Sequence, residues 1–302
     1  MPPSPADSGH DPVLLEQVLK TLNPLMGQTF IDCTLGRAGH AWAIAEKLGR
    51  DGLLVGLDVD SRNLQFAQER LANAPCRVRL FHANFAELED VVHELNDAPL
   101  NGILADLGIS TNQLFDSHYG LSFAQEMPLD MRLDARLEQT AADLVNDFSE
   151  TDLANVLYEL AQERYSRRIA RKIGEARRQS PITSTQRLAE LVRSVIPSRK
   201  GSREKIDPAT RTFLALRMKV NREMENLAAL LQQAPRFLAR SGRLGIISFQ
   251  STEDRMVKQA FRSAEQTGLV RVLTKKPITP SEAEIAANPR SRSAKLRVIE
   301  KL

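Results

Sequence analysis

The chain has 302 residues, of which 42% are hydrophobic and 26% are charged, and its formal net charge is +3. This is an ordinary globular composition, and the length predicts about two domains. Two cysteines exclude a disulfide framework and a four-cysteine zinc site, and the histidines show no metal-ligand spacing. No apolar run approaches the roughly 18 residues of a membrane span, and the N-terminus lacks the layout of a secretory signal. We therefore expect a soluble, cytoplasmic protein without a metal site.

Strand and helix patterns alternate over the first third of the chain. Short β-favouring runs cover residues 29–35, 52–60, 77–83 and 101–107, and helical patterns between them cover residues 42–48, 63–71 and 87–95. This order predicts a parallel sheet whose strands are joined by right-handed helical crossovers.

The alternation stops after about residue 121. Helical patterns cover residues 150–160, 163–178, 185–195 and 207–240, and the first and third follow the cap-like residues Ser149 and Ser184. Strand patterns return at residues 243–249, 269–274 and 294–302, and the stretches 201–205 and 279–293 have the composition of loops. We predict a doubly wound, mostly parallel α/β sheet with an all-helical insertion between its fourth and fifth strands.

Basic residues gather in the expected insertion. Residues 161–205 contain thirteen Lys and Arg against four acidic residues, so this segment carries +9 and the rest of the chain is acidic. Such a distribution indicates a polyanionic partner, although solvated helix faces produce the same pattern.

Two features at the ends of predicted strands indicate a ligand site. Gly36 and Gly39 follow the first strand, at the edge where open α/β sheets bind ligands, although an ordinary strand-to-helix turn also uses glycines. The full G-x-G-x-x-G dinucleotide pattern is absent. Asp58 ends the second strand, where an acid accepts hydrogen bonds from the ribose of NAD or S-adenosylmethionine, the alternative being a solvated strand-end acid. Together these features predict a nucleoside-containing ligand.

Other residues near the same edge have two interpretations each. Asp106 ends the fourth strand, where the reactive end of the ligand is expected, or it is a turn acid. Phe85 either covers an adenine face or packs in the core, and His40 either touches the ligand or caps a helix. Cys33 and Cys76 are interpreted as small core residues.

Motifs over nearly the whole length resemble one family. They are HDPVLLEQVL at 10–19, DCTLGRAGHA at 32–41, LVGLDVD at 54–60, ILADLGISTNQL at 103–114, YGLSF at 119–123, PLDMRLD at 128–134, ERYSRRIARKI at 163–173, DPATRTFLALRMKVNRE at 207–223, ISFQSTEDRMVK at 247–258 and NPRSRSAKLRV at 289–298. In this order they resemble the bacterial 16S ribosomal RNA cytosine-N4 methyltransferases, which use S-adenosylmethionine. The resemblance implies a Rossmann-like class I methyltransferase domain formed by residues 1–120 and 207–302, and a helical insertion, 121–206, that recognises RNA.

The resemblance also implies site residues and a substrate. The implied cofactor contacts are Ala38, Gly39, His40, Asp58, Phe85, Asp106 and Gln113. The implied reaction is methyl transfer to N4 of a cytidine in the decoding region of 16S rRNA in the small ribosomal subunit. Asp106, or a backbone carbonyl in 107–110, is the candidate acceptor of the N4 hydrogens. We expect RNA phosphates to contact Arg167, Arg168, Arg171, Arg199, Lys200, Arg290 and Arg292.

The chain departs from the family pattern at three positions. Ala38 stands where the family usually has glycine, and its methyl group is sterically mild if φ stays negative there. Asp207 and Gln250 stand where the family usually has histidine, which argues against either position as an obligatory acid, base or metal ligand. Enzymes that methylate adenine N6 or cytosine N4 in DNA often place an aromatic residue after the acid equivalent to Asp106, and residues 107–109 supply none.

Two other classes of function fit parts of the pattern. An NAD-dependent oxidoreductase shares the fold, but the missing third glycine and the lack of a catalytic His or Tyr constellation argue against it. A non-catalytic RNA-binding or ribosome-assembly factor with a degenerate cofactor pocket is the main alternative, because of the departures at Asp207 and Gln250.

Overall fold

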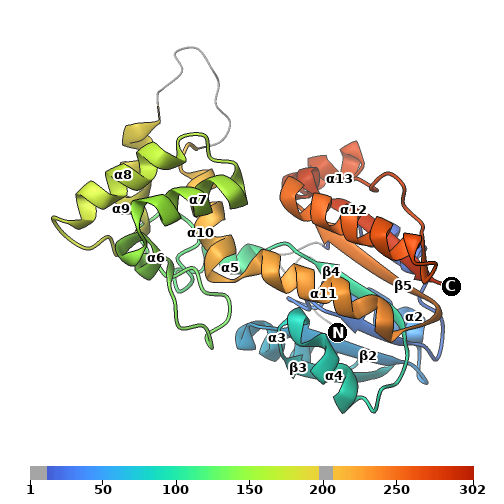
Figure 1. Cartoon of the computed structure of the whole chain (residues 1–302). Helices are drawn as coiled ribbons and strands as arrows, with labels where there is room; N and C mark the ends of the chain where they lie inside the picture. The colour runs from blue at the N-terminus through green and yellow to red at the C-terminus, as the bar shows by residue number, and fades with distance from the viewer. Residues whose placement is uncertain (1–11, 197–206) are drawn as a thin grey trace. The chain divides into compact units, whose positions relative to one another are not determined.

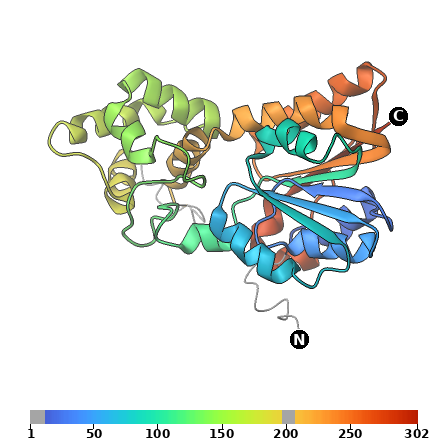
Figure 2. The ribbon, with the colours of Figure 1, turned by 90° about the horizontal axis from the view of Figure 1, so that it is seen from below.

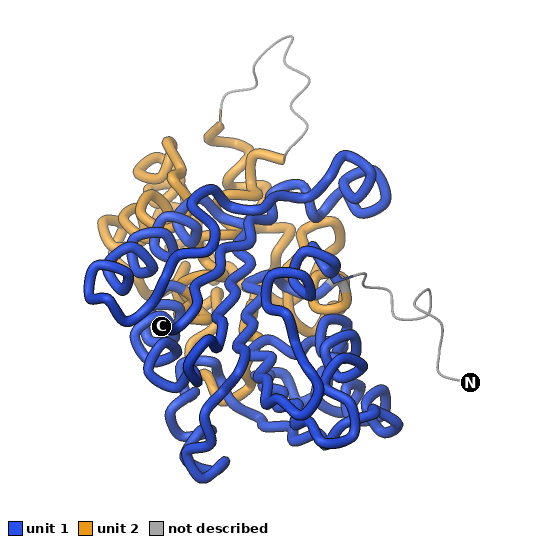
Figure 3. Tube along the Cα trace, turned by 90° about the vertical axis from the view of Figure 1, so that its right-hand side faces the viewer, with its two compact units in different colours: residues 1–110, 224–302 blue, residues 111–223 orange. Residues whose placement is uncertain are grey.

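The structure is a computed structural model, and it describes residues 12–196 and 207–302. The chain divides into two compact units, one formed by residues 1–110 and 224–302 and the other by residues 111–223 (Figure 3). The second unit is wider than the expected insertion 121–206, because helix α10 (Thr210–Val220) packs against helix α7 (Glu150–Ala161) of the same unit. Arg199, Lys200 and the loop expected at 201–205 lie outside the described residues.

A seven-stranded sheet forms the centre of the first unit (Figure 1). Its strands are β1 (Thr29–Asp32), β2 (Leu53–Asp58), β3 (Arg77–His82), β4 (Leu100–Asp106), β5 (Leu238–Ser248), β6 (Val270–Val272) and β7 (Lys295–Lys301). The spatial order is β3-β2-β1-β4-β5-β7-β6, in which β1 to β5 pair in parallel and β7 is antiparallel to β5 and β6. The predicted mostly parallel, doubly wound sheet, interrupted between its fourth and fifth strands, is confirmed.

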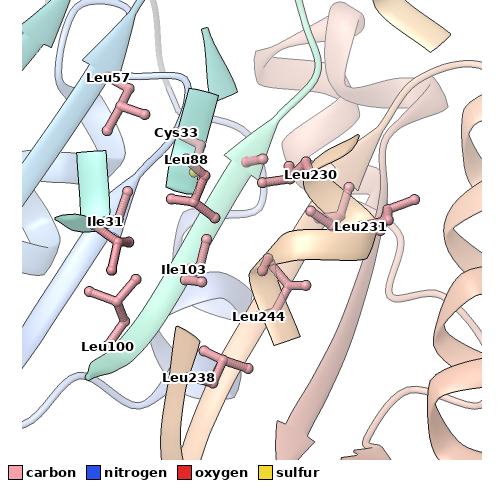
Figure 4. Packing of buried hydrophobic residues seen from close by; sticks show 14 of the residues in the cluster. Ile31, Cys33, Leu57, Leu88, Leu100, Ile103, Leu230, Leu231, Leu238 and Leu244 are labelled. Atoms are coloured by element: carbon pink, nitrogen blue, oxygen red, sulfur yellow. The ribbon is translucent and has the colours of Figure 1, made fainter. Parts of the chain in front are cut away.

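Helices cover both faces of this sheet (Figure 2). Helices α1 (Leu15–Leu22), α2 (Gly39–Leu48) and α3 (Ser61–Leu71) pack on one face, and α4 (Leu88–Glu94), α11 (Glu223–Phe237) and α12 (Ser251–Gln266) pack on the other. In α11, Leu227, Leu230, Leu231 and Ala234 recur at helical spacing and are buried. Figure 4 shows Leu230 and Leu231 facing the strands. Each buried leucine of this kind contributes about 1.5–3 kcal/mol, and this packing fixes the strands that carry the site.

The second unit is helical. It contains α5 (Thr111–Phe115), α6 (Ala141–Asp147), α7, α8 (Ser166–Arg177), α9 (Thr185–Val195) and α10. The side chains of Ser149 and Ser184 accept hydrogen bonds from the backbone N–H groups of Asp152 and Arg187. The two helix caps predicted from the sequence are therefore confirmed.

The single long helix expected over 207–240 is wrong. The structure has two helices, α10 and α11, and strand β5 begins at Leu238 instead of 243. The break falls at Asn221, whose side chain donates to the carbonyl of Met131 and accepts from the N–H of Leu133, and at Arg222, whose φ is +51°. Hydrogen bonds to a distant loop and a left-handed residue end the helix here, although the apolar spacing continues across the break.

The segment 279–293 is more ordered than the expected loop. It contains helix α13 (Glu282–Ala287) and a 3-10 helix, η3 (Pro289–Ser293). The side chain of Ser281 accepts a hydrogen bond from the N–H of Glu284 and so caps α13. Such short elements give too few residues for a periodic pattern to be visible in the sequence.

Among the helices in the described part of the chain, none is both long and apolar enough to span a membrane.

Candidate functional site

Asp58 ties the β1–α2 loop to the end of β2. Its Oδ2 accepts hydrogen bonds from the backbone N–H of Gly36 at 2.7 Å and from the amide of Asn63 at 3.3 Å, and its Oδ1 accepts from the N–H of Asp60 at 2.9 Å. The residue is only 8% exposed. Burial raises the pKa of Asp58 to about 7, although the hydrogen bonds from Asp60 and Gly36 oppose the shift. The structure thus brings together the glycine loop and the strand-end acid singled out in the sequence.

Ala38, at the start of α2, is in a left-handed conformation with φ of +58°. The expectation that its methyl group is mild required a negative φ, and it is wrong. Its N–H donates to the carbonyl of Leu35 and its side chain is fully buried, so the tight turn imposes the conformation. A non-glycine residue here costs about 1–2 kcal/mol.

We expect Ala38→Gly to raise the free energy of unfolding by about 0.2–1.2 kcal/mol. Glycine relieves about 1–2 kcal/mol of backbone strain, and the loss of one buried methyl group costs about 0.8 kcal/mol. Urea unfolding measures the difference. Ala41→Gly is the matched control, because Ala41 is equally buried within α2 and should lose stability. An equal loss of unfolding free energy in Ala38→Gly and Ala41→Gly would contradict the proposed backbone strain at Ala38.

Asp106 lies at the end of β4 in a second network of contacts. Its backbone N–H donates to Oγ1 of Thr34 at 2.6 Å, and its Oδ1 accepts from the N–H of Gly108 at 3.2 Å. Its Oδ2 lies 4.0 Å from Nδ1 of His40. Nε2 of His40 lies 2.8 Å from the carbonyl of Val13 and donates to it, since a carbonyl only accepts. His40 therefore both holds the chain before α1 and faces the carboxylate of Asp106.

Sequence reasoning missed three residues of this site: Asp32, Thr34 and Asn63. Asp32 is 2% exposed, and its Oδ1 accepts from the N–H of Thr34. Burial raises the pKa of Asp32 to about 6, the charge of His40 opposes the shift, and the charge of Asp106 adds to it. The sequence did not indicate Asp32 as a strand-end acid, because the expected strand ran over 29–35 and placed Asp32 inside it, whereas β1 ends at Asp32.

For Phe85 the structure shows the core packing that was one of its two interpretations, and its cofactor contact stays a prediction. Phe85 belongs to the 3-10 helix η2 (Phe85–Glu87) and packs, partly buried, against the core. Residues 107–109 supply no aromatic ring, but Phe249, just after β5, lies beside Gly108: a Cβ on Gly108 would be 2.9 Å from its ring. Gln113 is buried in α5 of the second unit, so its expected cofactor contact stays a prediction.

The two positions that lack the family's histidines have structural roles. Asp207 forms an ion pair with Arg193 at 2.7 Å and accepts from the N–H of Ala209 at the start of α10. Partial burial acts to raise the pKa of Asp207, but the hydrogen bonds from Arg193 and Ala209 bring it below its usual value. Gln250 precedes α12, and Oε2 of Glu253 accepts its N–H at 3.0 Å.

The expected RNA contacts lie in both units. On α8, Arg167, Arg168 and Arg171 are exposed, whereas Ile169 and Ile173 are buried, so the helix has a basic outer face. Arg168 stacks on the ring of Tyr165 at 5.6 Å. Within the described residues, Arg167 and Arg171 form no ion pair. Arg290 and Arg292, in η3 of the first unit, are also exposed.

Comparison with known proteins identifies relatives that match nearly end to end. The model of the MraW methylase family matches residues 7–302. A protein of Acidobacterium capsulatum named Ribosomal RNA small subunit methyltransferase H is 45% identical over 299 residues, which cover 97% of this chain and 98% of that protein. Proteins with the same name from Syntrophotalea carbinolica and Thermotoga neapolitana are 46% and 45% identical, cover 97% and 96% of this chain, and are themselves covered to 98% and 95%.

Proposed function

Because the chain belongs to the MraW methylase family, we propose that it methylates N4 of a cytidine in the decoding region of 16S ribosomal RNA. S-adenosylmethionine is the methyl donor. The observation that carries this proposal is the coupling of two strand-end acids to one loop: Asp58 through the N–H of Gly36, and Asp106 through Oγ1 of Thr34. These contacts lie at the carboxyl edge of parallel strands, where open α/β sheets bind ligands.

The groups at this edge fit a cationic nucleoside. Asp32, Asp58 and Asp106 end β1, β2 and β4, so the edge is rich in hydrogen-bond acceptors and negative charge. A carboxylate has about four acceptor sites, and three N–H groups bind that of Asp58, which leaves capacity for a ribose hydroxyl. A sulfonium with an ammonium group matches such an edge, whereas the pyrophosphate of NAD would be repelled. The other proposed contacts with S-adenosylmethionine are made by Ala38, Gly39, His40, Phe85 and, from the second unit, Gln113.

Bound S-adenosylmethionine supplies an electrophilic methyl group, so the protein has to position the acceptor amine and receive its proton. Positioning contributes on the order of 7–11 kcal/mol in favourable cases. The lone pair of cytosine N4 is delocalised into the ring, and Asp106 frees it by accepting an N4 hydrogen bond. As N4 bonds to the methyl carbon, it displaces the thioether, which leaves with the electron pair of the methyl–sulfur bond, and N4 releases a proton in the direction of this carboxylate. Nδ1 of His40 lies 4.0 Å from the carboxylate of Asp106, close enough for the two groups to interact electrostatically.

The basic face of α8 binds the RNA phosphates in this proposal. The double variant Arg167→Gln/Arg171→Gln is expected to lower RNA affinity and to reduce the slope of log affinity against log salt by about 2, because two phosphate contacts are lost. Filter binding over a salt series measures the slope. Arg187→Gln, on α9, is the matched control, since Arg187 is exposed but already pairs with Glu190 at 3.6 Å. Equal slopes for both variants would refute the role of α8.

The test of the function is methyl incorporation into small ribosomal subunits from cells that lack the protein, followed by nucleoside analysis. We expect label from S-adenosylmethionine in N4-methylcytidine of 16S rRNA. Label on another atom would overturn the cytosine-N4 assignment. RNA binding without any incorporation would instead support the non-catalytic assembly factor. Naked 16S rRNA assayed in parallel shows whether the assembled particle is needed.

A further inference from the structure

A cavity separate from the β1–α2 loop lies in the first unit between α12 and the strands β6 and β7. Its volume is about 230 Å³. Four of its lining residues are cations, Lys258, Arg262, Lys275 and Arg297, and one is an acid, Glu265. The cavity is therefore basic, although the first unit does not contain the arginine-rich helices of the second.

The cations around this cavity have few anionic partners. Arg297 is held by Asp254, with Nε 2.6 Å from Oδ1 and Nη2 3.2 Å from Oδ2. In the parts of the chain that the structure describes, Lys258, Arg262 and Lys275 have neither an ion pair nor a hydrogen bond through their side chains. Like charges that converge on one cavity repel each other unless an anion joins them.

A buried hydroxyl adds a neutral donor to this cavity. Thr274 is 7% exposed, and its Oγ1 accepts a hydrogen bond from the N–H of Val298 at 2.8 Å. Since that bond uses a lone pair, the hydroxyl hydrogen is left to donate. The carboxylate of the single acid, Glu265, already accepts a hydrogen bond from the backbone N–H of Val272, with Oε1 at 2.8 Å. The lining thus offers cations and a hydroxyl donor to a compact, acceptor-rich ligand.

We propose that this cavity binds a phosphate group of the RNA substrate. Phosphate oxygens accept charge-assisted hydrogen bonds from Lys and Arg, and hydroxyl donors are common partners. The volume lies below the roughly 300–1,000 Å³ of typical small-molecule sites, which favours a phosphate over a whole nucleotide cofactor. This assignment rests on the proposed function, because it takes RNA as the substrate.

The register of the sheet sets the distance of this phosphate from the reacting base. Asp106 pairs with Ile247 and Ile247 with Leu296, while Val298, two residues along β7, bonds Thr274. The cavity lining therefore lies within about two residues of the level of Asp106 and two to three strands away, about 10–14 Å at the usual strand spacing. The phosphate accordingly belongs to a neighbouring nucleotide and fixes the RNA backbone beside the target base.

The test compares the triple variant Lys258→Gln/Arg262→Gln/Lys275→Gln with Arg255→Gln. Arg255 is an exposed cation on the same helix that does not line the cavity. Inorganic phosphate should shift the amide NMR signal of Thr274 in the wild type and in Arg255→Gln, and not in the triple variant. RNA affinity should fall about tenfold in the triple variant, with a salt slope reduced by about 1, and by less than about twofold in the control.

The outcomes separate the cavity from the methylation proposal. Equal RNA affinity in the triple variant and the control would overturn the phosphate site. Phosphate binding that RNA does not displace would overturn the RNA assignment and indicate a free phosphoryl compound. If phosphate and RNA respond as expected but the wild type transfers no methyl group, the cavity assignment stands and the proposed function fails. S-adenosylhomocysteine affinity should stay unchanged in both variants.

Discussion

Asp58→Ala is expected to weaken S-adenosylhomocysteine binding by about 1.5–3 kcal/mol, or roughly 10- to 150-fold in Kd. The variant removes the carboxylate that is proposed to accept a hydrogen bond from the ribose. It also leaves the N–H groups of Gly36 and Asp60 without their acceptor, so the glycine loop loses its tie to β2. Isothermal titration calorimetry measures the change directly.

Asp60→Asn is the matched control for this experiment. Asp60 lies two residues from Asp58 and caps α3 by accepting the N–H of Arg62, and asparagine caps helices equally well. The control should therefore keep the wild-type Kd within about twofold. Thermal unfolding of both variants separates a loss of binding from a loss of fold. An unchanged Kd in folded Asp58→Ala would reject the ribose assignment.

The same residue predicts how cofactor affinity depends on pH. Burial places the pKa of Asp58 at about 7, and hydroxyl groups donate to the ionised form. Below pH 7 the carboxyl is protonated and must release a proton before it can accept from a ribose hydroxyl as a carboxylate does. Affinity should thus fall about tenfold from pH 8 to pH 6, one factor of ten per unit of pH once the proton is bound. Asp58→Ala should abolish this dependence, whereas a dependence that persists would assign it to Asp32.

Asp106→Asn is expected to slow methyl transfer by about 100-fold or more, the usual effect of losing a positioned proton acceptor. Asparagine keeps the shape of the side chain but cannot accept a proton as a carboxylate does. Single-turnover transfer at saturating RNA and S-adenosylmethionine isolates this step from binding. The main-chain bond from Asp106 to Oγ1 of Thr34 does not involve the side chain and is retained.

The pH profile decides between proton acceptance and a purely structural role for Asp106. A structural role would lower the rate by the same factor at every pH, whereas a lost acceptor changes the profile. Asp60→Asn again controls for the removal of one negative charge near the sheet edge. Full single-turnover activity in Asp106→Asn would transfer the role to the backbone carbonyls of 107–110.

The alternation of strands and helices was predictable because parallel strands that are buried on both faces appear in the sequence as continuous apolar runs. Two of these runs end in an acid, at Asp58 and at Asp106. The break between α10 and α11 was not predictable, since the side-chain bonds of Asn221 reach Met131 and Leu133, about ninety residues earlier. The strain at Ala38 was also hidden, because a sequence gives residue types and not φ angles.

Site residues were predictable where a single acid ends a strand at the carboxyl edge of the sheet. They were less predictable where a contact joins residues that are far apart in the sequence. Phe249 beside Gly108 joins the ends of β5 and β4, which are far apart in the chain. Likewise, the ion pair of Asp207 with Arg193 explains an acid in place of the family's histidine, and only the fold of the second unit brings the two together.

The neighbouring strands β4 and β5 are separated along the chain by residues 107–237. The entropy of closing such a loop grows only logarithmically, by about 0.6 kcal/mol per doubling of length. Compared with a short turn, this connection is longer by about four to five doublings and costs about 3 kcal/mol more, which the burial of one or two leucines offsets. It is kinetically slow, because contacts between distant residues form late. Within residues 111–223, helices α7 and α8 are neighbours in sequence and are expected to pair before the sheet closes, whereas α10 packs on α7 and Asn221 bonds Met131 across long separations and should join later.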